Sequence, residues 1–264
     1  MARILITGCS TGIGRATAVE CTKRGNEVVA TARRVDTLDD LDVAQKLRLD
    51  VDDDASVRDA VAAAGTIDVL VNNAGWEVSG PVESAPIDVV RAMFETNYFG
   101  ALRMVQAVVP SMRERGAGIV VNVSSVAGRV SAPFGGFYAG TKYALEALSE
   151  AMHYELAHFG IRTAIIEPGV IETNFGANVR HYSKDSPPYD ELDLQWEGAL
   201  DRLREGDAPG AELVAAVIAD AIDDPATPLR SPVGEDAALI VATRASLDDA
   251  TFEATMRETL GLTW

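Results

Sequence analysis

The stretch Thr7-Gly8-Cys9-Ser10-Thr11-Gly12-Ile13-Gly14 follows a short apolar run and opens a helical pattern. Glycine permits both a tight turn and a close approach of the backbone to a bound group, and the N–H groups at a helix start attract anions. A turn of this kind can also be only a strand-to-helix connection. The stretch predicts a strand, a turn and a helix, with a phosphate-binding site at the turn.

Short apolar strands alternate with helical periods along the rest of the chain. The expected strands are Ile4–Thr7, Glu27–Thr31, Lys46–Leu49, Ile67–Val71, Ile119–Val123, Thr163–Ile166 and Leu229–Val233. The expected helices are Gly14–Arg24, Ser56–Ala64, Ile87–Arg115, Phe137–His158, Ala211–Ile222 and Leu247–Leu260, with left-handed caps at Gly25 and Gly65. This alternation, together with right-handed crossovers, predicts an α/β fold. We expect a Rossmann-type, doubly wound, mostly parallel seven-stranded sheet flanked by helices on both faces.

A chain of 264 residues can bury its core as one domain, and no internal repeat is visible. We therefore expect residues 1–264 to form a single domain. The composition changes only in the polar stretch from Asn174 to Pro209. Because long irregular segments of compact domains are usually lids or disordered, we expect a substrate lid at 174–209. The alternative is that this segment is an ordinary surface loop.

Charge and cysteine content narrow the possible partners and the compartment. Forty acidic residues against 23 basic ones give a net charge of −17, which argues against nucleic acid as a partner. The sequence begins directly with a strand pattern, and no apolar run approaches the ~20 residues of a membrane span. Cys9 and Cys21 cannot form a disulfide framework and are expected to serve packing. These observations predict a cytoplasmic protein without a membrane span.

One acidic segment imitates a metal site. Asp50, Asp52 and Asp54 have the spacing that begins a calcium-binding loop. However, Ala55 stands where that loop requires glycine, and Val61 stands where it requires a bidentate glutamate. Asp52 or Asp54 is expected to cap the next helix instead. The three histidines form no ligand cluster, so we expect no metal.

A second motif, Tyr138-Ala139-Gly140-Thr141-Lys142, begins 13 residues after Ser125. Tyr138 and Lys142 are four apart on a helix and share a face, although such a pair is also common on helix surfaces. A free phenol has a pKa near 10, which an adjacent ammonium and an oxidised nicotinamide would lower. Ser125 would donate a hydrogen bond to a substrate oxygen as charge develops there. With the glycine-rich turn, this motif predicts hydride chemistry on a carbonyl or an alcohol.

These motifs resemble those of the short-chain dehydrogenase/reductase family, whose turn reads Thr-Gly-x-x-x-Gly-x-Gly. Asn97 in Glu95–Gly100 matches the asparagine of the family's catalytic tetrad, and Asn122–Ser125 matches its serine motif. The resemblance implies four catalytic residues. They are Asn97, Ser125, Tyr138 and Lys142. Among them, Asn97 would hold a water that links Lys142 to solvent. Residues 97–103 and 171–176 resemble the branch that contains 17β-hydroxysteroid and retinol dehydrogenases.

The resemblance also implies the contacts of a nicotinamide dinucleotide. The segment Asn72–Gly75 would lie beside the cofactor, Asp50 and Val51 at its adenine end, and Pro168–Thr173 at the nicotinamide carboxamide. The expected contact residues are Gly8, Ser10, Thr11, Gly12, Ile13, Gly14, Arg33, Asp50, Val51, Asn73, Ala74, Gly75, Tyr138, Lys142, Pro168, Gly169, Val170 and Thr173.

The end of the second strand bears on the choice of cofactor. Enzymes that prefer NAD place an acidic residue there, where it binds the adenosine ribose. In this chain the position is Ala32, and Arg33 follows, whereas Asp36 lies too far along. A guanidinium can bind a 2′-phosphate through paired, charge-assisted hydrogen bonds, so we expect NADP(H) to be preferred over NAD(H). The alternative is that Arg33 and Arg34 are solvated bases on a loop.

Together, the motifs predict an NAD(P)-dependent oxidoreductase that interconverts a small-molecule alcohol and a ketone or aldehyde, with Tyr138 exchanging the proton. A cofactor-sensing regulator on the same fold is the alternative, against which Tyr138 and Lys142 argue, because a sensor needs no proton donor. An epimerase or dehydratase would carry a larger C-terminal portion. The resemblance further implies a homodimer or homotetramer paired through the helices near Ile87–Arg115 and Phe137–His158.

Overall fold

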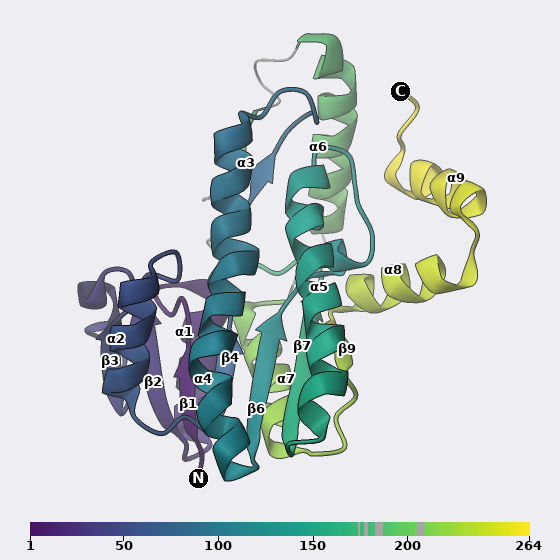
Figure 1. The fold of residues 1–264 in the computed structure, drawn as a ribbon. Helices are drawn as coiled ribbons and strands as arrows, with labels where there is room; N and C mark the ends of the chain where they lie inside the picture. Colours follow the sequence, from purple (N-terminus) through teal and green to yellow (C-terminus); the bar gives the residue numbers. More distant parts are fainter. Residues whose placement is uncertain (174, 177–178, 183–186, 205–208) are drawn as a thin grey trace.

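The computed structural model describes residues 1–264 except 174, 177–178, 183–186 and 205–208 (Figure 1). Its centre is a seven-stranded sheet in which every pair of neighbouring strands is parallel, in the order β3-β2-β1-β4-β6-β7-β9. The strands are β1 Arg3–Ile6, β2 Glu27–Ala32, β3 Gln45–Arg48, β4 Val69–Asn72, β6 Gly118–Val123, β7 Ile161–Pro168 and β9 Arg230–Val233. The strand order reverses between β1 and β4, so the predicted doubly wound, seven-stranded fold is confirmed.

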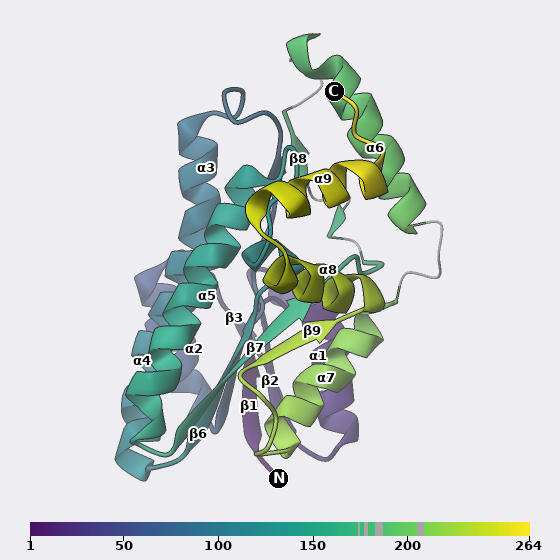
Figure 2. The same cartoon turned by 90° about the vertical axis from the view of Figure 1, so that its right-hand side faces the viewer.

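Two apolar layers enclose this sheet (Figures 1 and 2). Helices α1 and α7 pack on one face, and α2, α4 and α5 pack on the other. Their bounds are α1 Gly12–Lys23, α2 Asp54–Ala64, α4 Ala101–Arg115, α5 Gly136–Ala157 and α7 Ala211–Asp223. In β1, Ile4 and Ile6 enter the first layer and Leu5 enters the second, because successive side chains of a strand point to opposite faces. Both faces are therefore buried, which explains the uninterrupted apolar runs in the sequence.

The helices differ from the prediction in two places. The expected helix over Ile87–Arg115 consists of α3 (Ile87–Phe94), a π-helical turn at Glu95–Gly100, and α4. Helices α6 (Asp190–Arg204) and α8 (Glu235–Ser246) were not predicted from the sequence, whereas the final helix, α9 (Asp249–Leu260), was expected. Among the described residues of α8 only Ala237 is fully buried, so this helix carries no apolar stripe that periodicity could detect.

The turns at the helix ends were predicted in part. Gly25 and Gly65 have positive φ angles of +84° and +73°, which favour glycine. The ψ of Gly65 is −139°, so the left-handed cap predicted there was wrong. The cap of α2 is Asp53, whose carboxylate accepts a 2.9 Å hydrogen bond from the N–H of Ala55. The expectation of Asp52 or Asp54 at this position was wrong by one residue. The cap must be the last residue with extended backbone, and this is Asp53.

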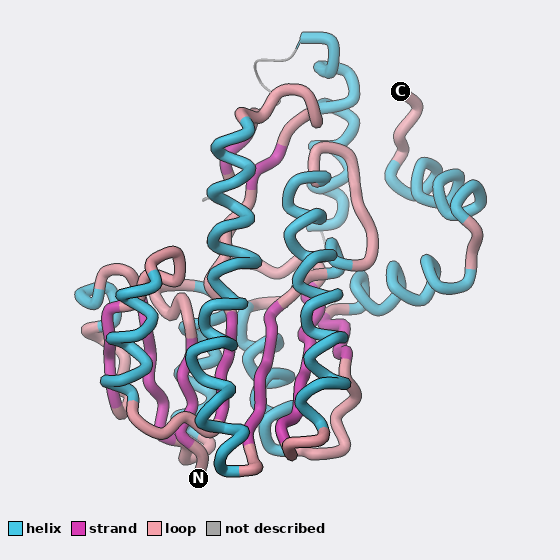
Figure 3. Tube along the Cα trace, in the orientation of Figure 1, coloured by secondary structure: helices cyan, strands magenta, loops and turns pink. Residues whose placement is uncertain are grey.

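The predicted lid spans residues 174–209. All the residues that the structure does not describe, Asn174 among them, belong to this segment, and its described part includes helix α6. Its base closes where the N–H of Glu172 donates to the carbonyl of Pro209 at 3.0 Å. A short strand, β8 (Arg180–His181), pairs with β5 (Val78–Ser79). Helices α6 and α9 lie above the carboxyl ends of the central strands, which Figure 3 shows in magenta.

Helix α6 is joined to the C-terminal segment by a small apolar cluster. The cluster contains Ala199, Leu260 and Leu262, with Leu192, Trp196 and Met256 packed against it. Polar contacts add to it, since Gln195 Oε1 accepts from the N–H of Thr263 at 2.8 Å and Arg202 donates to the carbonyl of Leu260 at 2.6 Å. Among the helices in the described part of the chain, none is both long and apolar enough to span a bilayer.

Candidate active site

A pocket of about 2410 Å³ lies at the carboxyl ends of the central strands. Ligands of open α/β sheets bind at this edge, beside the point where the strand order reverses. All the predicted cofactor residues line the pocket except Gly14, and so do three of the four predicted catalytic residues, Ser125, Tyr138 and Lys142. Asn97 lies outside it. The structure therefore brings together residues that are up to 165 positions apart, from Gly8 to Thr173.

The glycine-rich turn leaves a cradle that side chains would fill. Gly8 has a φ of +75°, and a Cβ there would lie 3.0 Å from Cα of Ala74. A Cβ on Gly14 would lie 2.4 Å from both Asn73 Nδ2 and the Gly8 carbonyl oxygen, so Gly14 supports the turn from behind. Gly12 has a φ of +57°, and among the described residues only Thr173 lies within 4 Å of its added Cβ. This open turn at a helix start fits the pyrophosphate of a dinucleotide.

Hydrogen bonds tie this turn to the end of β4. Nδ2 of Asn73 donates to the carbonyl oxygens of Thr7 and Gly8 at 2.9 and 3.1 Å. The hydroxyl of Thr7 accepts from the backbone N–H groups of Asn73 and Ala74 at 2.9 and 3.0 Å. The turn after β1 and the segment after β4 are therefore held as one rigid wall of the pocket.

The end of β2 presents a cation to the pocket. Ala32, the last residue of β2, is buried, and Arg33 follows it with an exposed side chain that lines the pocket beside Asp50. The neighbouring Arg34 instead forms an ion pair with Asp36 at 3.4 Å. Arg33 therefore brings a guanidinium to the wall of the pocket at the end of β2.

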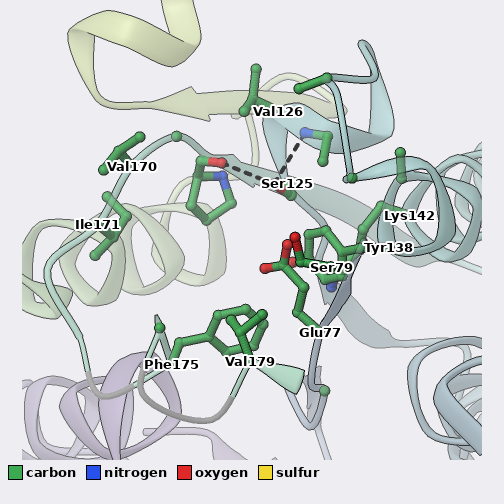
Figure 4. Close-up of a pocket in the computed structure, with 18 of the residues that line it drawn as sticks. Glu77, Ser79, Ser125, Val126, Tyr138, Lys142, Val170, Ile171, Phe175 and Val179 are labelled. Carbon is green, nitrogen blue, oxygen red and sulfur yellow. Dashed lines mark hydrogen bonds between the residues drawn. The ribbon is translucent and has the colours of Figure 1, made fainter. Parts of the chain in front are cut away.

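Tyr138 and Ser125 meet at the other end of the pocket (Figure 4). Tyr138 lies in the first turn of α5, and Ser125, with extended backbone, is the second residue after β6. The Ser125 hydroxyl accepts from the N–H of Ala127 at 3.1 Å and donates to the carbonyl of Pro168 at 3.4 Å. The ring of Tyr138 packs against Phe175, with the ring centroids 5.9 Å apart.

The surroundings of Tyr138 disfavour its charged form. Burial raises the pKa of the phenol, the carboxylate of Glu77 raises it further, and a hydrogen bond with Ser125 lowers it. The expected lowering of this pKa is therefore not produced by the chain itself. That expectation combined the ammonium of Lys142 with the positive charge of an oxidised nicotinamide.

Lys142 is buried directly behind Tyr138. Its Nζ donates to the carbonyl oxygen of Val123 at 2.9 Å and lies 5.5 Å from the centroid of the Tyr138 ring. Burial lowers the pKa of Lys142 to about 8, although Glu146 and Glu77 raise it. An ammonium with this pKa can hold or release a proton close to neutral pH.

Asn97 lies in the π-helical turn, behind the wall of the main pocket. Its Nδ2 donates to the carbonyl of Trp76 at 2.9 Å and to the hydroxyl of Thr141 at 3.1 Å, while its Oδ1 accepts from the N–H of Trp76 at 3.0 Å. With Lys142 it lines a separate space of about 10 Å³, which is about the volume that one water needs. The extra residue of a π turn aims this side chain inward, and such turns are frequent at functional sites.

Some pocket residues were not predicted from the sequence. Trp76, Glu77 and Ser79 directly follow the Asn72–Gly75 motif, and this adjacency was the available signal. Farther away, α6, α8 and α9 contribute an apolar wall. It includes Trp196, Leu200, Leu239, Ile240 and Met256.

Metal-binding clusters and reactive thiols were sought among the described residues. Within the described ranges, no three His, Cys, Asp or Glu side chains are grouped so that they could hold a metal ion. Cys9 and Cys21 are buried and free, and burial raises the pKa of each thiol to about 12. Both thiols are therefore protonated and inert at neutral pH.

Comparison with known proteins identifies the family. A family model described as short chain dehydrogenase matches residues 2–184. The chain is 39% identical over 224 residues to an uncharacterized oxidoreductase of Schizosaccharomyces pombe, covering 81% of this chain and 92% of the relative. It is 40% identical over 185 residues to retinol dehydrogenase 8 of Homo sapiens, covering 65% of this chain and 60% of the relative. It is 37% identical over 179 residues to 3-ketodihydrosphingosine reductase of Bacteroides thetaiotaomicron, covering 66% of each chain.

Solved structures agree with this assignment. A short-chain dehydrogenase from Streptomyces avermitilis superposes with a TM-score of 0.84 at 36% identity, over 100% of this chain and 98% of that one. The closed form of a serine dehydrogenase in complex with NADP⁺ has a TM-score of 0.75 at 26% identity, over 87% of this chain and 93% of that one. A family match across more than half of the chain, with relatives at this level of identity, shows that the protein belongs to the short-chain dehydrogenase/reductase family of oxidoreductases.

Proposed function

We propose that the protein interconverts an alcohol and a ketone or aldehyde with a nicotinamide dinucleotide, and that Tyr138 donates and accepts the proton. The observation that carries this proposal is the hydrogen-bonded pair of Tyr138 and Ser125 at one end of a pocket whose other end is the glycine-rich turn. When bound, the nicotinamide supplies or accepts the hydride.

Each of the four proposed catalytic residues has one task. Ser125 donates a hydrogen bond to the substrate oxygen. Tyr138 gives its proton to that oxygen during reduction, and its raised pKa keeps the phenol protonated at neutral pH, ready to donate. Lys142 returns a proton to Tyr138. The space it shares with Asn97 suits a single water that would connect this path to solvent.

We also propose that NADP(H) is preferred over NAD(H). Arg33 faces the pocket beside the uncharged Ala32, so a 2′-phosphate would meet a cation and no carboxylate at the end of β2. The structurally similar serine dehydrogenase in complex with NADP⁺ supports this choice. The same surface would bind the adenosine ribose of NAD(H) through fewer charged contacts.

The proposed substrate is a large, apolar molecule held under a lid at 174–209. The apolar wall from α6, α8 and α9 supports this size and polarity, and so do the names of two relatives, a retinol dehydrogenase and a 3-ketodihydrosphingosine reductase. We take residues 1–264 as a single domain. The described part of the lid packs against α9 and would cover the substrate. A screen of long-chain, retinoid and steroid carbonyl compounds tests the substrate class.

The decisive experiment replaces Tyr138 with phenylalanine. Tyr138→Phe is expected to lower kcat by about 10²- to 10⁴-fold or more while NADPH still binds. Tyr154→Phe is the control, because it removes a phenol from the same helix at a site that is 74% exposed. Absorbance of the nicotinamide follows turnover, and its fluorescence follows binding. Unaffected turnover in Tyr138→Phe would refute the mechanism, and binding without turnover of any carbonyl compound would favour the cofactor-sensing alternative.

We further propose that two copies pair through α4 and α5. Tyr143 of α5 is 46% exposed, and Phe99, in the π-helical turn before α4, is 44% exposed. Aromatic side chains of this kind are enriched at interfaces between chains. Sedimentation velocity would show a dimer or tetramer, and a species of only 28.0 kDa would exclude it. The cytoplasmic location expected from the sequence stays a prediction.

A further inference from the structure

A cluster of charged side chains joins α5, β7 and β9. The guanidinium of Arg230, in β9, donates to Glu146 at 2.9 Å and to Glu150 at 2.6 Å, both on α5. Arg129 donates to Glu167, in β7, at 3.0 Å. The two sets of charges meet where Arg230 lies 3.8 Å from Glu167. The proposed reaction assigns no task to these side chains.

Two carboxylates of this cluster are deeply buried. Glu146 is 5% exposed and Glu167 is 0% exposed. In each, one oxygen accepts from a guanidinium, while the other makes no hydrogen bond to any group in the described part of the chain. The backbone leaves room for this arrangement, since a Cβ on Gly128 would lie 2.9 Å from Cγ of Glu146. A buried carboxylate held in this way needs further positive charge to stay ionised.

Lys142 supplies that charge. The three carboxylates of the cluster exceed its two guanidinium groups by one charge. Lys142 precedes Glu146 by four residues on α5, so the two share a helix face, and Lys142 is itself only 5% exposed. Its ammonium is a third buried cation, which balances the three carboxylates.

The charge of Glu146 in turn acts on Lys142. Burial lowers the pKa of Lys142 to about 8, and two carboxylates oppose this effect, first Glu146 and then Glu77, which follows β4. The third titratable group beside the ammonium is Tyr138, whose ring centroid lies 5.5 Å away. Tyr138, Lys142 and Glu146 follow one another at four-residue intervals along one face of α5. A phenol, an ammonium and a carboxylate are therefore arranged in a row.

We propose that Glu146 is a positioning residue for the reaction, which acts through Lys142 by holding that side chain in its ammonium form. This rests on the proposed function, because it takes Lys142 as the group that returns a proton to Tyr138. Glu146 is not part of the described lining of the pocket, so it would act without touching substrate or cofactor. Arg230 fixes the direction of its carboxylate and offsets part of its charge.

The test replaces Glu146 with glutamine, which removes the charge and keeps the shape. Glu146→Gln is expected to lower the midpoint of the Lys142 titration by about one to two pH units, the usual effect of losing a close opposite charge. NMR of the full chain with ¹³C-labelled lysine measures this midpoint without turnover. The Lys142 signal is identified by its loss in Lys142→Met. Because kcat for ketone reduction needs the ammonium, its decline at high pH should move to lower pH by the same amount.

Glu150→Gln is the matched control. Glu150 binds the same guanidinium at 2.6 Å, but its side chain is 49% exposed and it lies about two turns of α5 from Lys142. Its neutralisation should leave the midpoint as in the wild type. Arg230 keeps at least one carboxylate partner in either variant, and urea unfolding reports that both are folded.

A second variant predicts a change of opposite sign, and it serves if Glu146→Gln does not fold. Arg230→Gln leaves all three carboxylates in place and removes the cation that offsets the charge of Glu146. The midpoint of Lys142 should therefore rise above that of the wild type.

Several outcomes would overturn the proposal. Equal midpoints in the wild type and Glu146→Gln would do so, and so would an equal fall in Glu150→Gln, because any lost charge near Arg230 would then suffice. An unchanged or lowered midpoint in Arg230→Gln rejects it as well. Failure of the proposed function has a different signature, because the NMR midpoint would still fall in Glu146→Gln while no ketone is reduced or the pH dependence of kcat stays unchanged.

Discussion

The ammonium of Lys142 donates a hydrogen bond to the carbonyl oxygen of Val123, with 2.9 Å between the two atoms. This contact holds a buried cation at the end of β6, between the main pocket and the small space lined by Asn97. Burial lowers the pKa of Lys142 from 10.5 to about 8, so the folded protein holds this proton less tightly than the unfolded chain does.

A pH dependence of stability follows from this shift. Between pH 8 and 10.5 the unfolded chain binds more protons at Lys142 than the folded protein does, so the free energy of unfolding rises with pH in this window. The difference between wild type and Lys142→Met, which carries no such proton, should grow by about 3 kcal/mol in favour of the wild type across the window. Urea unfolding at several pH values measures it, and a flat difference would contradict the assigned pKa.

The contact between Gly14 and the glycine-rich turn predicts a steric effect. An added methyl at Gly14 meets the Gly8 carbonyl oxygen at 2.4 Å, so Gly14→Ala is expected to destabilise the protein by about 1–3 kcal/mol and to weaken NADPH binding. Gly140→Ala, in the interior of α5, is the control, because the added methyl would lie 3.4 Å from the ring of Phe94 in α3. That change should stabilise by about 0.5–1 kcal/mol. Equal unfolding midpoints for the two variants would show that the turn can relax.

Arg33 and its neighbour offer a paired test of cofactor choice. Arg33→Ala is expected to weaken NADPH binding by about 1.5–3 kcal/mol and to change NADH binding little, because only NADPH carries the 2′-phosphate. Arg34→Ala removes an equal charge that is already paired with Asp36, and it should affect neither cofactor much. Fluorescence titration of both cofactors gives the four affinities. Tighter binding of NADH than NADPH by the wild type would reject the assignment.

The cluster between α6 and α9 predicts an effect on substrate alone. Leu260 is 6% exposed in that cluster, and Leu260→Ala would remove contacts worth about 2–3 kcal/mol. The loss loosens α9 from α6, so KM for large apolar ketones should rise about tenfold while NADPH affinity stays the same. Leu213→Ala, at a 43% exposed position of α7, is the control. An unchanged KM would show that the two helices do not shape the substrate site.

Much of this protein was determined by local sequence. The glycine-rich turn, the short apolar runs, the 3.6-residue periods and the glycine helix ends predicted the sheet, its helices and the family, because each depends on residues that are close in the chain. The spacing of Tyr138 and Lys142 on one helix face likewise needed no tertiary information. The family resemblance that these motifs carry implied a set of cofactor-contact residues, and all of them except Gly14 line the pocket.

Tertiary structure alone decided the rest. The π turn places Asn97 behind the wall of the main pocket, and burial together with the charge of Glu77 raises the pKa of Tyr138. The apolar wall joins helices such as α6 and α9, whose residues meet only when separate parts of the chain pack together. Burial and the field of distant charges depend on the whole fold, and for this reason the polarity of the substrate end could not be deduced from periodicity or spacing.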